Sequence, residues 1–474
     1  MKVLSVTSEC VPFIKTGGLA DVAGALPGAL ADLGVEMRVM MPAYPALTKF
    51  VSNGHAVLDD PDLMGGPARL ISVKAKGLSL YLLDAPHLFD RGAGPYLDED
   101  GKDWSDNPER FAALSWMAAR VMAEGAGDWQ PDLLHGHDWQ AGFAPYYLRR
   151  RFRSDAPCVL TIHNVAFHGA APATRMPALR LDPADFHPGG FEFWGNVNAL
   201  KAGIVYADRI TTVSPTYARE LMRPAFGAGL DGVLRARGGA VSGILNGIDT
   251  GVWDPANDPA VPHGYKTARG KAKNKAALRA EMGLPDAEGP LCVVVSRLTE
   301  QKGLDLLLAA LPALLARGGQ LALLGSGDLA LENAFQRAAA EHPGVAVRIG
   351  YDEALSHRLV AGGDAMLVPS RFEPCGLTQM YALRYGTIPV VALTGGLADT
   401  VIHASPAALA TGAATGLQFY PVTADGMEQA LIDLATLYAQ PKVWARMQRN
   451  AMAHPVGWGS SAAAYHALYA DLVT

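Results

Sequence analysis

Beginning at Leu291, the chain alternates short, mostly apolar runs with longer segments whose apolar residues recur every three or four positions. This alternation predicts parallel strands joined by crossover helices, because parallel strands need such connections and are buried on both faces. The predicted strands are residues 291–296, 320–324, 345–349, 365–368 and 388–393, and the predicted helices are 303–317, 329–341 and 376–385. The sequence therefore predicts a doubly wound α/β domain.

The N-terminal half shows the same alternation less regularly. Its predicted strands are residues 2–7, 35–41, 78–83, 133–136, 158–163 and 209–213, and its predicted helices are 19–33, 110–124 and 194–206. This half is therefore also expected to form a doubly wound, parallel sheet.

A stretch over residues 252–275, rich in Pro, Gly, Asn and Asp, separates the two halves. We place the boundary there and expect one domain over residues 1–250 and a second over 251–455. Two similar domains joined in this way predict a deep cleft, lined by loops from the carboxyl ends of the strands. The stretch ends in five basic residues, which favour a solvated linker more than a phosphate or nucleic-acid contact.

Composition excludes several classes of protein. The 474 residues have a net charge of −6 that is spread along the chain, so nothing drives the protein toward nucleic acid or an anionic membrane. The four cysteines are far apart, which disfavours a disulfide framework or a structural zinc site and fits a reducing cytoplasm. No export signal or membrane span is expected.

Glycine-rich or charged loops follow several predicted strands. Residues 15–22, KTGGLADV, follow the first strand and open the first helix, so their backbone N–H groups are expected to cradle an anion or hydroxyl beside Lys15. The order of residues is not that of a P-loop, and a tight turn with an exposed lysine is the alternative.

Two histidines and an aspartate end another predicted strand, in the sequence HGHDW at residues 135–139. His135 and His137 share a face of this strand, and His163 ends a neighbouring one. A metal site is conceivable, but histidines beside Asp and Trp also suit polar ligands such as sugars, which we favour.

Residues 296–303, SRLTEQKG, follow the first strand of the second half. Arg297 and Lys302 flank this loop, and two cations at that position suit a diphosphate. The alternative is ion pairing at the surface with Glu300 or Asp305.

Residues 369–380, PSRFEPCGLTQM, leave a strand and enter a helix. The N–H groups of residues 376–378 are expected to face an anion at the helix N-terminus. Glu373 stands beside this site as an isolated carboxylate, which is best explained if it accepts hydrogen bonds from sugar hydroxyls. Cys375 is either a reactive thiol or a small packed residue.

Glycines 325 and 327 also follow a strand, and Asp352 lies downstream, which makes a dinucleotide fingerprint and a dehydrogenase arguable. The match is weak because it lies in the second βα unit of its domain and not in the first.

Taken together, these motifs resemble those of the bacterial glycogen synthase and plant starch synthase family. The resemblance covers nearly the whole chain and rests on KTGGLADV (15–22), HGHDW (135–139), TIHN (161–164), LNGID (245–249), SRLTEQKG (296–303) and PSRFEPCGLTQMYALRYGTIPVV (369–391). It implies the GT-B fold and a retaining glucosyltransferase that extends an α-1,4-glucan from ADP-glucose. It also implies a last helix, about residues 456–474, that crosses back to the first domain, and no bound metal or cofactor. No oligomeric state is predicted.

The resemblance further implies roles for individual residues. Lys15 and Gly18 would approach the donor phosphates, and Arg297 and Lys302 would hold the diphosphate from the second domain. In the family, the main-chain carbonyl of the residue matching His163 lies at the reacting centre.

Other residues would contact the sugars. Asp21, His163 and Glu373 would address glucose, and Tyr96 would lie on the acceptor side. We expect His163, Glu373, Arg297 and Lys302 to be catalytic. The remaining substrate-binding positions are Asp138, Asn164, Asn246, Cys375, Gly376, Leu377 and Thr378.

Three other functions stay open at this stage. A glycan phosphorylase has the same architecture but carries pyridoxal phosphate and is usually much longer. A dehydrogenase would bind NAD at residues 325–330, and a non-catalytic glycan-binding protein would need neither Lys302 nor Glu373.

Overall fold

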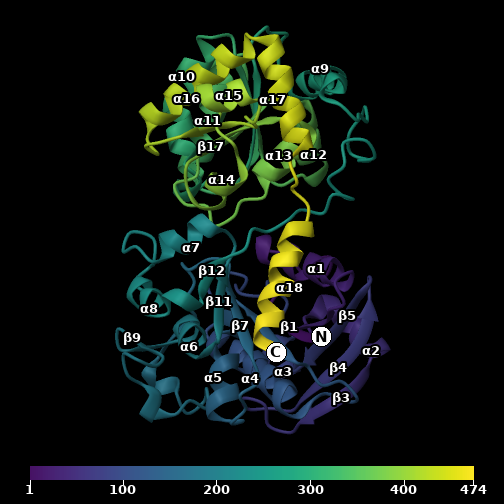
Figure 1. Ribbon diagram of the computed structural model, residues 1–474, viewed down its shortest axis with the longest axis vertical. Helices are drawn as coiled ribbons and strands as arrows, with labels where there is room; N and C mark the ends of the chain where they lie inside the picture. Colours follow the sequence, from purple (N-terminus) through teal and green to yellow (C-terminus); the bar gives the residue numbers. More distant parts are fainter. Residues whose placement is uncertain (474) are drawn as a thin grey trace. The chain divides into compact units, whose positions relative to one another are not determined.

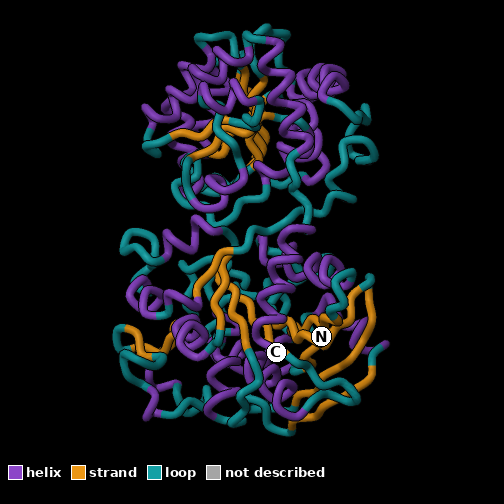
Figure 2. The backbone as a smooth tube through the Cα atoms, in the orientation of Figure 1, coloured by secondary structure: helices purple, strands orange, loops and turns teal. Residues whose placement is uncertain are grey.

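The computed structural model describes residues 1–473, which divide into two compact units. The first unit comprises Met1–Gly247 together with the segment from Trp458 onward, and the second comprises Ile248–Gly457. In each unit, strands form a central sheet and helices cover its faces (Figures 1 and 2).

The main sheet of the first unit has the strand order β12-β11-β7-β6-β1-β2-β5-β4-β3. Its strands are β1 (Lys2–Val6), β2 (Glu36–Pro42), β3 (His55–Asp60), β4 (Ala68–Ala75), β5 (Leu78–Asp84), β6 (Leu133–His137), β7 (Cys158–Ile162), β11 (Arg209–Thr212) and β12 (Val241–Gly243). The strands from β12 to β5 are parallel, whereas β4 and β3 are antiparallel to their neighbours. A small antiparallel sheet is formed by β8 (Ala170–Pro172), β10 (Asn196–Asn198) and β9 (Glu192–Phe193).

Helices cover this sheet and bury their apolar faces against it. They are α1 (Gly18–Ala31), α2 (Thr48–Asn53), α3 (Pro86–Phe89), α4 (Asn107–Glu124), α5 (Phe143–Arg150), α6 (Ala199–Tyr206), α7 (Pro215–Leu221), α8 (Asp231–Ala236) and α18 (Gly459–Val473). The C-terminal helix α18 packs against α1 (Figure 1). Tyr465 and Tyr469 of α18 are fully buried in a cluster with Val3 and Leu26.

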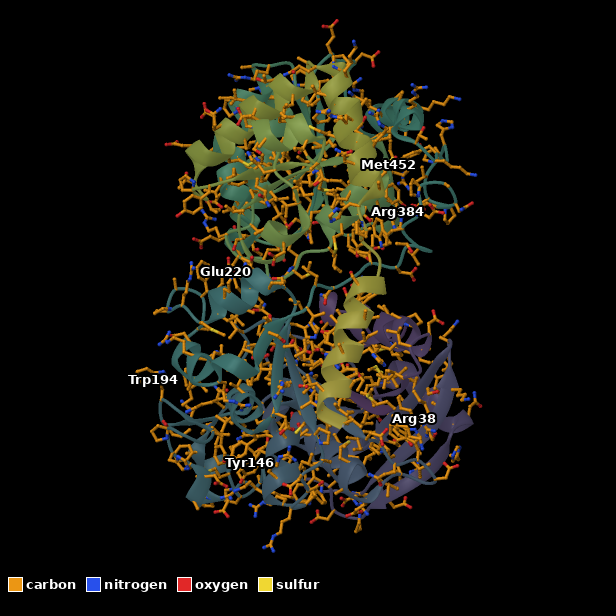
Figure 3. The ribbon with its side chains drawn as sticks, in the orientation of Figure 1. Arg38, Tyr146, Trp194, Glu220, Arg384 and Met452 are labelled. Carbon is orange, nitrogen blue, oxygen red and sulfur yellow. The ribbon has the colours of Figure 1, made fainter. Side chains whose placement is uncertain are left out.

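Two expectations for this unit were wrong. The sheet is not wholly parallel, because β3 and β4 add an antiparallel edge that was not predicted. The helix expected over residues 194–206 begins at Ala199, since Asn196–Asn198 is a strand and Asn198 caps the helix. Trp194 has a positive φ of 51° and is 84% exposed, with its side chain pointing away from the unit (Figure 3).

The second unit has a wholly parallel sheet in the order β15-β14-β13-β16-β17-β18. Its strands are β13 (Leu291–Val295), β14 (Gln320–Gly325), β15 (Val345–Ile349), β16 (Ala365–Val368), β17 (Ile388–Ala392) and β18 (Leu417–Phe419). Its helices are α9 (Lys271–Met282), α10 (Leu304–Leu315), α11 (Leu329–Glu341), α12 (Glu353–Gly362), α13 (Thr378–Tyr385), α14 (Gly395–Thr400), α15 (Pro406–Thr411), α16 (Ala424–Tyr438) and α17 (Pro441–Ala453). The predicted strands and helices of this half are therefore present, with ends that differ by at most two residues.

The basic stretch before and within α9 is a solvated linker only in part. Lys271 is buried, and its ammonium donates to the carbonyl of Ala361 and the hydroxyl of Thr387, each at 2.7 Å. Burial lowers the pKa of Lys271 to about 7. Lys275 pairs with Asp364 at 2.5 Å, so packing within the unit uses two of the five charges.

The segment that opens the second unit is also packed. Trp253 is stacked between His357 of α12 and Tyr381 of α13, with ring centroids 3.8 and 3.6 Å away. Arg384 of α13 donates to the Trp253 carbonyl and pairs with Asp254 at 3.1 Å. Among residues 1–473, no helix is both long and apolar enough to cross a membrane.

Candidate active site

In the first unit, the predicted site residues follow the carboxyl ends of neighbouring strands, where parallel sheets place their ligands. His137 ends β6, and His163 follows β7. The Nδ1 atom of His137 lies 3.0 Å from Nε2 of His163, and both rings are buried. Burial lowers the pKa of both imidazoles, and the adjacent His137 ring lowers that of His163 further. These two rings are therefore neutral near pH 7.

Asp138 fixes the backbone beside His163. Its carboxylate accepts hydrogen bonds from the backbone N–H groups of His163, at 2.6 Å, and Asn164, at 3.3 Å. Burial raises the pKa of Asp138 to about 7, although the two backbone N–H groups oppose this shift. Asp138 thus holds the backbone at His163. The structure therefore brings together Asp138, His163 and Asn164, all of which were predicted as site residues.

The loop at residues 15–18 is organised by Glu9, which sequence analysis did not select. The Glu9 carboxylate accepts from the backbone N–H groups of Thr16, at 2.5 Å, and Gly17, at 3.2 Å. The expectation that these two N–H groups bind an external anion is therefore wrong, because they already donate to an internal carboxylate. Lys15 lies at the surface and pairs with Asp21 at 2.9 Å.

Glu9 also links this loop to Tyr96. The Tyr96 hydroxyl donates to Glu9 at 2.9 Å and lies 2.6 Å from the Ser8 hydroxyl. Burial, reinforced by the Glu9 charge, raises the pKa of Tyr96 well above its usual value. The structure thus brings Tyr96 close to the loop that carries Lys15 and Gly18. A glutamate between the first strand, which ends at Val6, and a glycine-rich loop was the signal that could have identified Glu9.

Asn246 lies in the loop after β12 and is 6% exposed. Within residues 1–473, its buried Oδ1 atom accepts no hydrogen bond. A buried acceptor without a partner is costly, so this atom is suited to a ligand that supplies a donor.

In the second unit, a pocket of about 210 Å³ opens at the carboxyl ends of β13 and β16. Polar and charged side chains contribute much of its lining. The lining residues are Val295, Ser296, Arg297, Lys302, Leu304, Leu367, Val368, Pro369, Ser370, Glu373 and Thr378. Arg297, Lys302, Glu373 and Thr378, which the sequence selected separately, therefore share one pocket.

Glu373 is not the isolated carboxylate that the sequence suggested. Its Oε2 atom accepts from the Lys302 ammonium at 2.5 Å and from the Ser370 hydroxyl at 3.0 Å. Lys302 thus compensates the charge of Glu373, which is 8% exposed.

The surface ion pairs that were the alternative for Arg297 and Lys302 are not formed. Asp305 pairs instead with Arg371, through both carboxylate oxygens at 2.7 and 2.6 Å. Arg297 is exposed, and within the part of the chain that the structure describes it makes no ion pair. Its guanidinium is thus available to a ligand.

Two glycines allow the loops of this pocket to approach closely. A Cβ atom on Gly303 would lie 1.9 Å from the Pro369 carbonyl, and one on Gly395 would lie 1.9 Å from the Glu373 carbonyl. Both have positive φ angles, of 66° and 44°. These positions therefore require glycine, because a side chain would displace the backbone of residues 369–373.

Helix α13 begins two residues later than predicted. Gly376 has a φ of 70°, and Leu377 is the N-cap, without a side-chain hydrogen bond to the first turn. Thr378 lines the pocket, whereas Cys375 is buried, with its backbone packed against Gly396. The structure thus favours a packed role for Cys375.

The glycine-rich turn at residues 325–330 does not resemble a dinucleotide site. The N–H of Gly327 donates to Glu332 at 2.7 Å, and that of Ala330 donates to Asp328 at 2.8 Å. Gly325 and Gly327 lie against the backbone of residues 296–298. The turn therefore serves packing and helix capping.

Tyr351 was not selected from the sequence. It follows β15 at the carboxyl edge of the sheet, and 84% of its surface is exposed. An aromatic ring at this edge of a Rossmann-like sheet is a candidate for stacking on a nucleobase. Among residues 1–473, no group of three or more His, Cys, Asp or Glu side chains is arranged to hold a metal ion.

Comparison with known proteins decides the family. The starch synthase catalytic domain family matches residues 2–236, and the glycosyl transferases group 1 family matches residues 289–436. A glycogen synthase from Paracoccus denitrificans is 61% identical over 99% of this chain and 98% of its own length. The chain belongs to the glycogen synthase family.

Other relatives agree with this assignment. A glycogen synthase from Roseobacter denitrificans is 58% identical over the full length of both chains. The catalytic domain of starch synthase IV from Arabidopsis thaliana, solved with ADP and acarbose, is 32% identical with a TM-score of 0.87, covering 99% of both chains. HepE from Anabaena, with UDP-glucose, has a TM-score of 0.58 and 16% identity over 99% and 100% of the two chains, so it shares the fold alone.

These findings confirm the family and the GT-B fold that the motifs predicted. The protein is thus a glucosyltransferase of the glycogen synthase family. Which residues of the chain carry out the reaction stays a prediction.

Proposed function

We propose that the protein transfers glucose from ADP-glucose to the non-reducing end of an α-1,4-glucan, with retention of the anomeric configuration and release of ADP. The observation that carries this proposal is the pocket of the second unit, where Arg297, Lys302 and Glu373 lie together at the carboxyl ends of β13 and β16. Its two cations match a diphosphate, and its carboxylate matches sugar hydroxyls.

Arg297 and Lys302 would stabilise the departing diphosphate. Glycosyl transfer passes through an oxocarbenium-like state in which negative charge builds up on the leaving group. Fixed cations stabilise that state without reorganising, which is usually the largest electrostatic contribution to catalysis. Arg297 would bind the diphosphate through its exposed guanidinium, and Lys302 would act as a compact charge.

Glu373 would bind glucose. Its Oε2 atom accepts from Lys302 and Ser370, so the carboxylate is fixed before the substrate arrives. Carboxylate oxygens can each accept further hydrogen bonds, and sugar hydroxyls are donors of the right kind. The Lys302–Glu373 pair would thus connect the leaving group with the sugar.

We propose that residues of the first unit also bind substrate. Asp138 holds the backbone of His163 and His137 bonds its ring, so the carbonyl and the ring of His163 are both held in place. We propose that this carbonyl lies at the reacting centre and that the buried acceptor of Asn246 receives a hydrogen bond from substrate. Lys15, Gly18 and Asp21 would approach the donor from the start of α1.

We propose that the acceptor attacks on the face from which ADP leaves, with the departing phosphate taking the acceptor proton. Retention then needs no covalent intermediate on the protein. Tyr96, held by Glu9, would lie on the acceptor side. We place the reaction in the cytoplasm, where the four cysteines, which form no disulfide within residues 1–473, would stay reduced.

The first test is transfer of labelled glucose from ADP-glucose to glycogen, beside UDP-glucose and a reaction without acceptor, with ADP release recorded. We expect label in the polymer with ADP-glucose preferred. ADP release without labelled polymer would point to another acceptor, and turnover of neither donor by folded protein would refute the proposal.

Two variants test whether the reaction takes place in the proposed pocket. Glu373→Gln should keep the fold, since the amide can still meet Ser370, but it should lose transfer. Arg337→Ala removes an exposed arginine of α11 and should leave transfer unchanged. Wild-type turnover by folded Glu373→Gln would remove Glu373 from the site.

A further inference from the structure

A line of buried side chains leads to His163 across three adjacent parallel strands. Ser5 lies on β1, His137 lies on β6, and His163 follows β7. The Ser5 hydroxyl is 3.2 Å from Nε2 of His137, and Nδ1 of His137 is 3.0 Å from Nε2 of His163. Ser5 is 1% exposed, and His137 is fully buried. Bulk water therefore does not compete for these hydrogen bonds.

The two rings are neutral, so each carries one proton on one of its two nitrogens. Burial lowers the pKa of His137 to about 3, and burial together with His137 lowers the pKa of His163 well below its usual value. A hydrogen bond between two neutral imidazoles needs one N–H donor and one bare nitrogen. The direction of that bond sets which nitrogen of His163 carries the proton.

Ser5 determines this direction. Within residues 1–473, its hydroxyl forms a hydrogen bond with His137 alone. A buried hydroxyl proton without an acceptor costs free energy, so Ser5 should donate to Nε2 of His137. The proton of His137 then lies on Nδ1 and is donated to Nε2 of His163. His163 consequently carries its own proton on Nδ1.

The neighbouring His135 does not take part in these hydrogen bonds, because it has other partners. The His135 ring lies 4.2 Å from that of His137, centroid to centroid. Its two nitrogens are bonded elsewhere, to the Tyr469 hydroxyl at 2.7 Å and the Thr161 hydroxyl at 2.6 Å. His135 therefore cannot take the place of His163 as the partner of His137.

We infer that Ser5 and His137 are positioning residues that hold His163 as its Nδ1–H tautomer and present this N–H as a hydrogen-bond donor to a glucose hydroxyl. The inference rests on the proposed function for the identity of the ligand. The tautomer itself follows from the buried contacts and does not depend on catalysis. A histidine locked in one tautomer offers the sugar a donor of fixed direction, as outer partners of catalytic histidines do elsewhere.

Nitrogen NMR of the full-length protein, labelled with ¹⁵N-histidine, tests the tautomer. His163→Gln identifies the His163 signals, and the shifts of the two ring nitrogens distinguish N–H from bare nitrogen. We expect a neutral Nδ1–H form of His163 between pH 6 and 8. Ser5→Ala should convert it to a mixture, because the direction of the bond between the rings is no longer set.

Tyr469→Phe is the matched control, because it removes a buried hydrogen bond from His135 and leaves the Ser5 line intact. The His163 signals should then be unchanged. An Nε2–H or protonated His163 in the wild type, or the same tautomer in Ser5→Ala, would overturn the inference.

Kinetics provide the second measurement. Ser5→Ala and His137→Phe should lower kcat roughly 10-fold to 100-fold, the range typical of outer partners, while KM for the donor changes little. Tyr469→Phe should retain kcat. An unchanged kcat in folded Ser5→Ala would show that the tautomer has no role in transfer. If the wild type transferred no glucose, the proposed function would fail, yet the ring shifts would still report the tautomer.

Discussion

Lys302 lies 2.5 Å from Glu373, so its charge stabilises an internal carboxylate before any substrate binds. In the proposed reaction, the same ammonium also meets the negative charge that develops on the leaving diphosphate. That second interaction strengthens in the transition state, whereas the first is present throughout. Removing Lys302 should therefore affect the chemical step more than donor binding.

We predict that Lys302→Ala lowers kcat roughly 100-fold to 1,000-fold, as expected for loss of one preorganised electrostatic donor. Steady-state kinetics with ADP-glucose and glycogen measure this effect. Lys266→Ala, which removes an exposed lysine outside the pocket, should behave as wild type. An increase in KM with unaltered kcat would assign Lys302 to ground-state binding only.

The pKa of Asp138, raised from 3.8 to about 7, makes stability depend on pH. The native protein keeps this proton up to about pH 7, whereas the unfolded chain releases it near pH 3.8. The contribution of Asp138 to stability therefore falls as pH rises between these values, by up to about 1.4 kcal/mol per pH unit. Asp138→Asn removes this dependence, and its amide oxygen can still accept from the same backbone N–H groups.

We expect the free energy of unfolding of Asp138→Asn, relative to wild type, to increase from pH 5 to about pH 7 and then to level off. Urea denaturation at a series of pH values measures this difference. Parallel stability curves for the two proteins would show that Asp138 titrates normally in the folded state.

The junction between the loop at Glu300–Lys302 and helix α10 depends on Gly303. Its φ of 66° strains any other residue, and a Cβ atom would also lie 1.9 Å from the Pro369 carbonyl. Gly283 ends α9 with a similar φ of 71°, but a Cβ atom there meets nothing within 4 Å. Comparing the two glycines therefore separates the cost of backbone strain from the cost of a steric clash.

We predict that Gly283→Ala costs about 1–2 kcal/mol of stability, the cost of left-handed backbone, and retains kcat. Gly303→Ala should cost more and should also lower kcat, because the loop that carries Lys302 must move away from Glu373. Denaturation and kinetics of both variants provide the comparison. Equal losses of stability with full activity would mean that the loops tolerate the collision.

Most strands and helices of the protein could be predicted from the sequence because the periodicity of their apolar residues is strong. The strands of the second unit are buried on both faces and form continuous apolar runs, such as Leu291–Val295. In contrast, no residue of β3 (His55–Asp60) is buried and the strand carries charged residues, so no such pattern marks it. The helix start at Ala199 was missed because the sequence does not reveal that Trp194 adopts a left-handed turn.

Part of the candidate site could also be predicted from the sequence. Charged residues directly after strands identified Arg297, Lys302 and Glu373, because parallel sheets place such loops at one edge. Which cation pairs with which carboxylate could not be read, since Lys302 and Glu373 are 71 residues apart. Glu9 was missed because the sequence does not show that two backbone N–H groups and the hydroxyls of Thr16 and Tyr96 converge on its carboxylate.

Each of the two units has its own main sheet and its own core, and the C-terminal helix belongs to the first unit. Tyr465 is fully buried there, 5.5 Å from the His135 ring, centroid to centroid. Trp444 of α17 is buried in the second unit. Because each core is packed within its own unit, damage to one should leave the other largely intact.

We predict that Tyr465→Ala destabilises the first unit by about 3–5 kcal/mol, the usual cost of removing a large buried aromatic side chain. Hydrogen exchange should accelerate in β1 and β6 and stay unchanged in β13 and β14. Trp444→Ala should give the opposite pattern. Equal acceleration in both units by either variant would show that the chain unfolds as one cooperative block.

Helix α18 also determines when the first unit can finish folding during translation. The first unit buries Val3 and Leu26 against Tyr465 and Tyr469, yet these tyrosines are translated after the whole second unit, Ile248–Gly457. At roughly 5 to 20 residues per second, the nascent first unit would wait roughly 10 to 40 seconds with this apolar face uncovered. During biosynthesis, that face is therefore a natural substrate for chaperones, and slow codons late in the message would prolong its exposure.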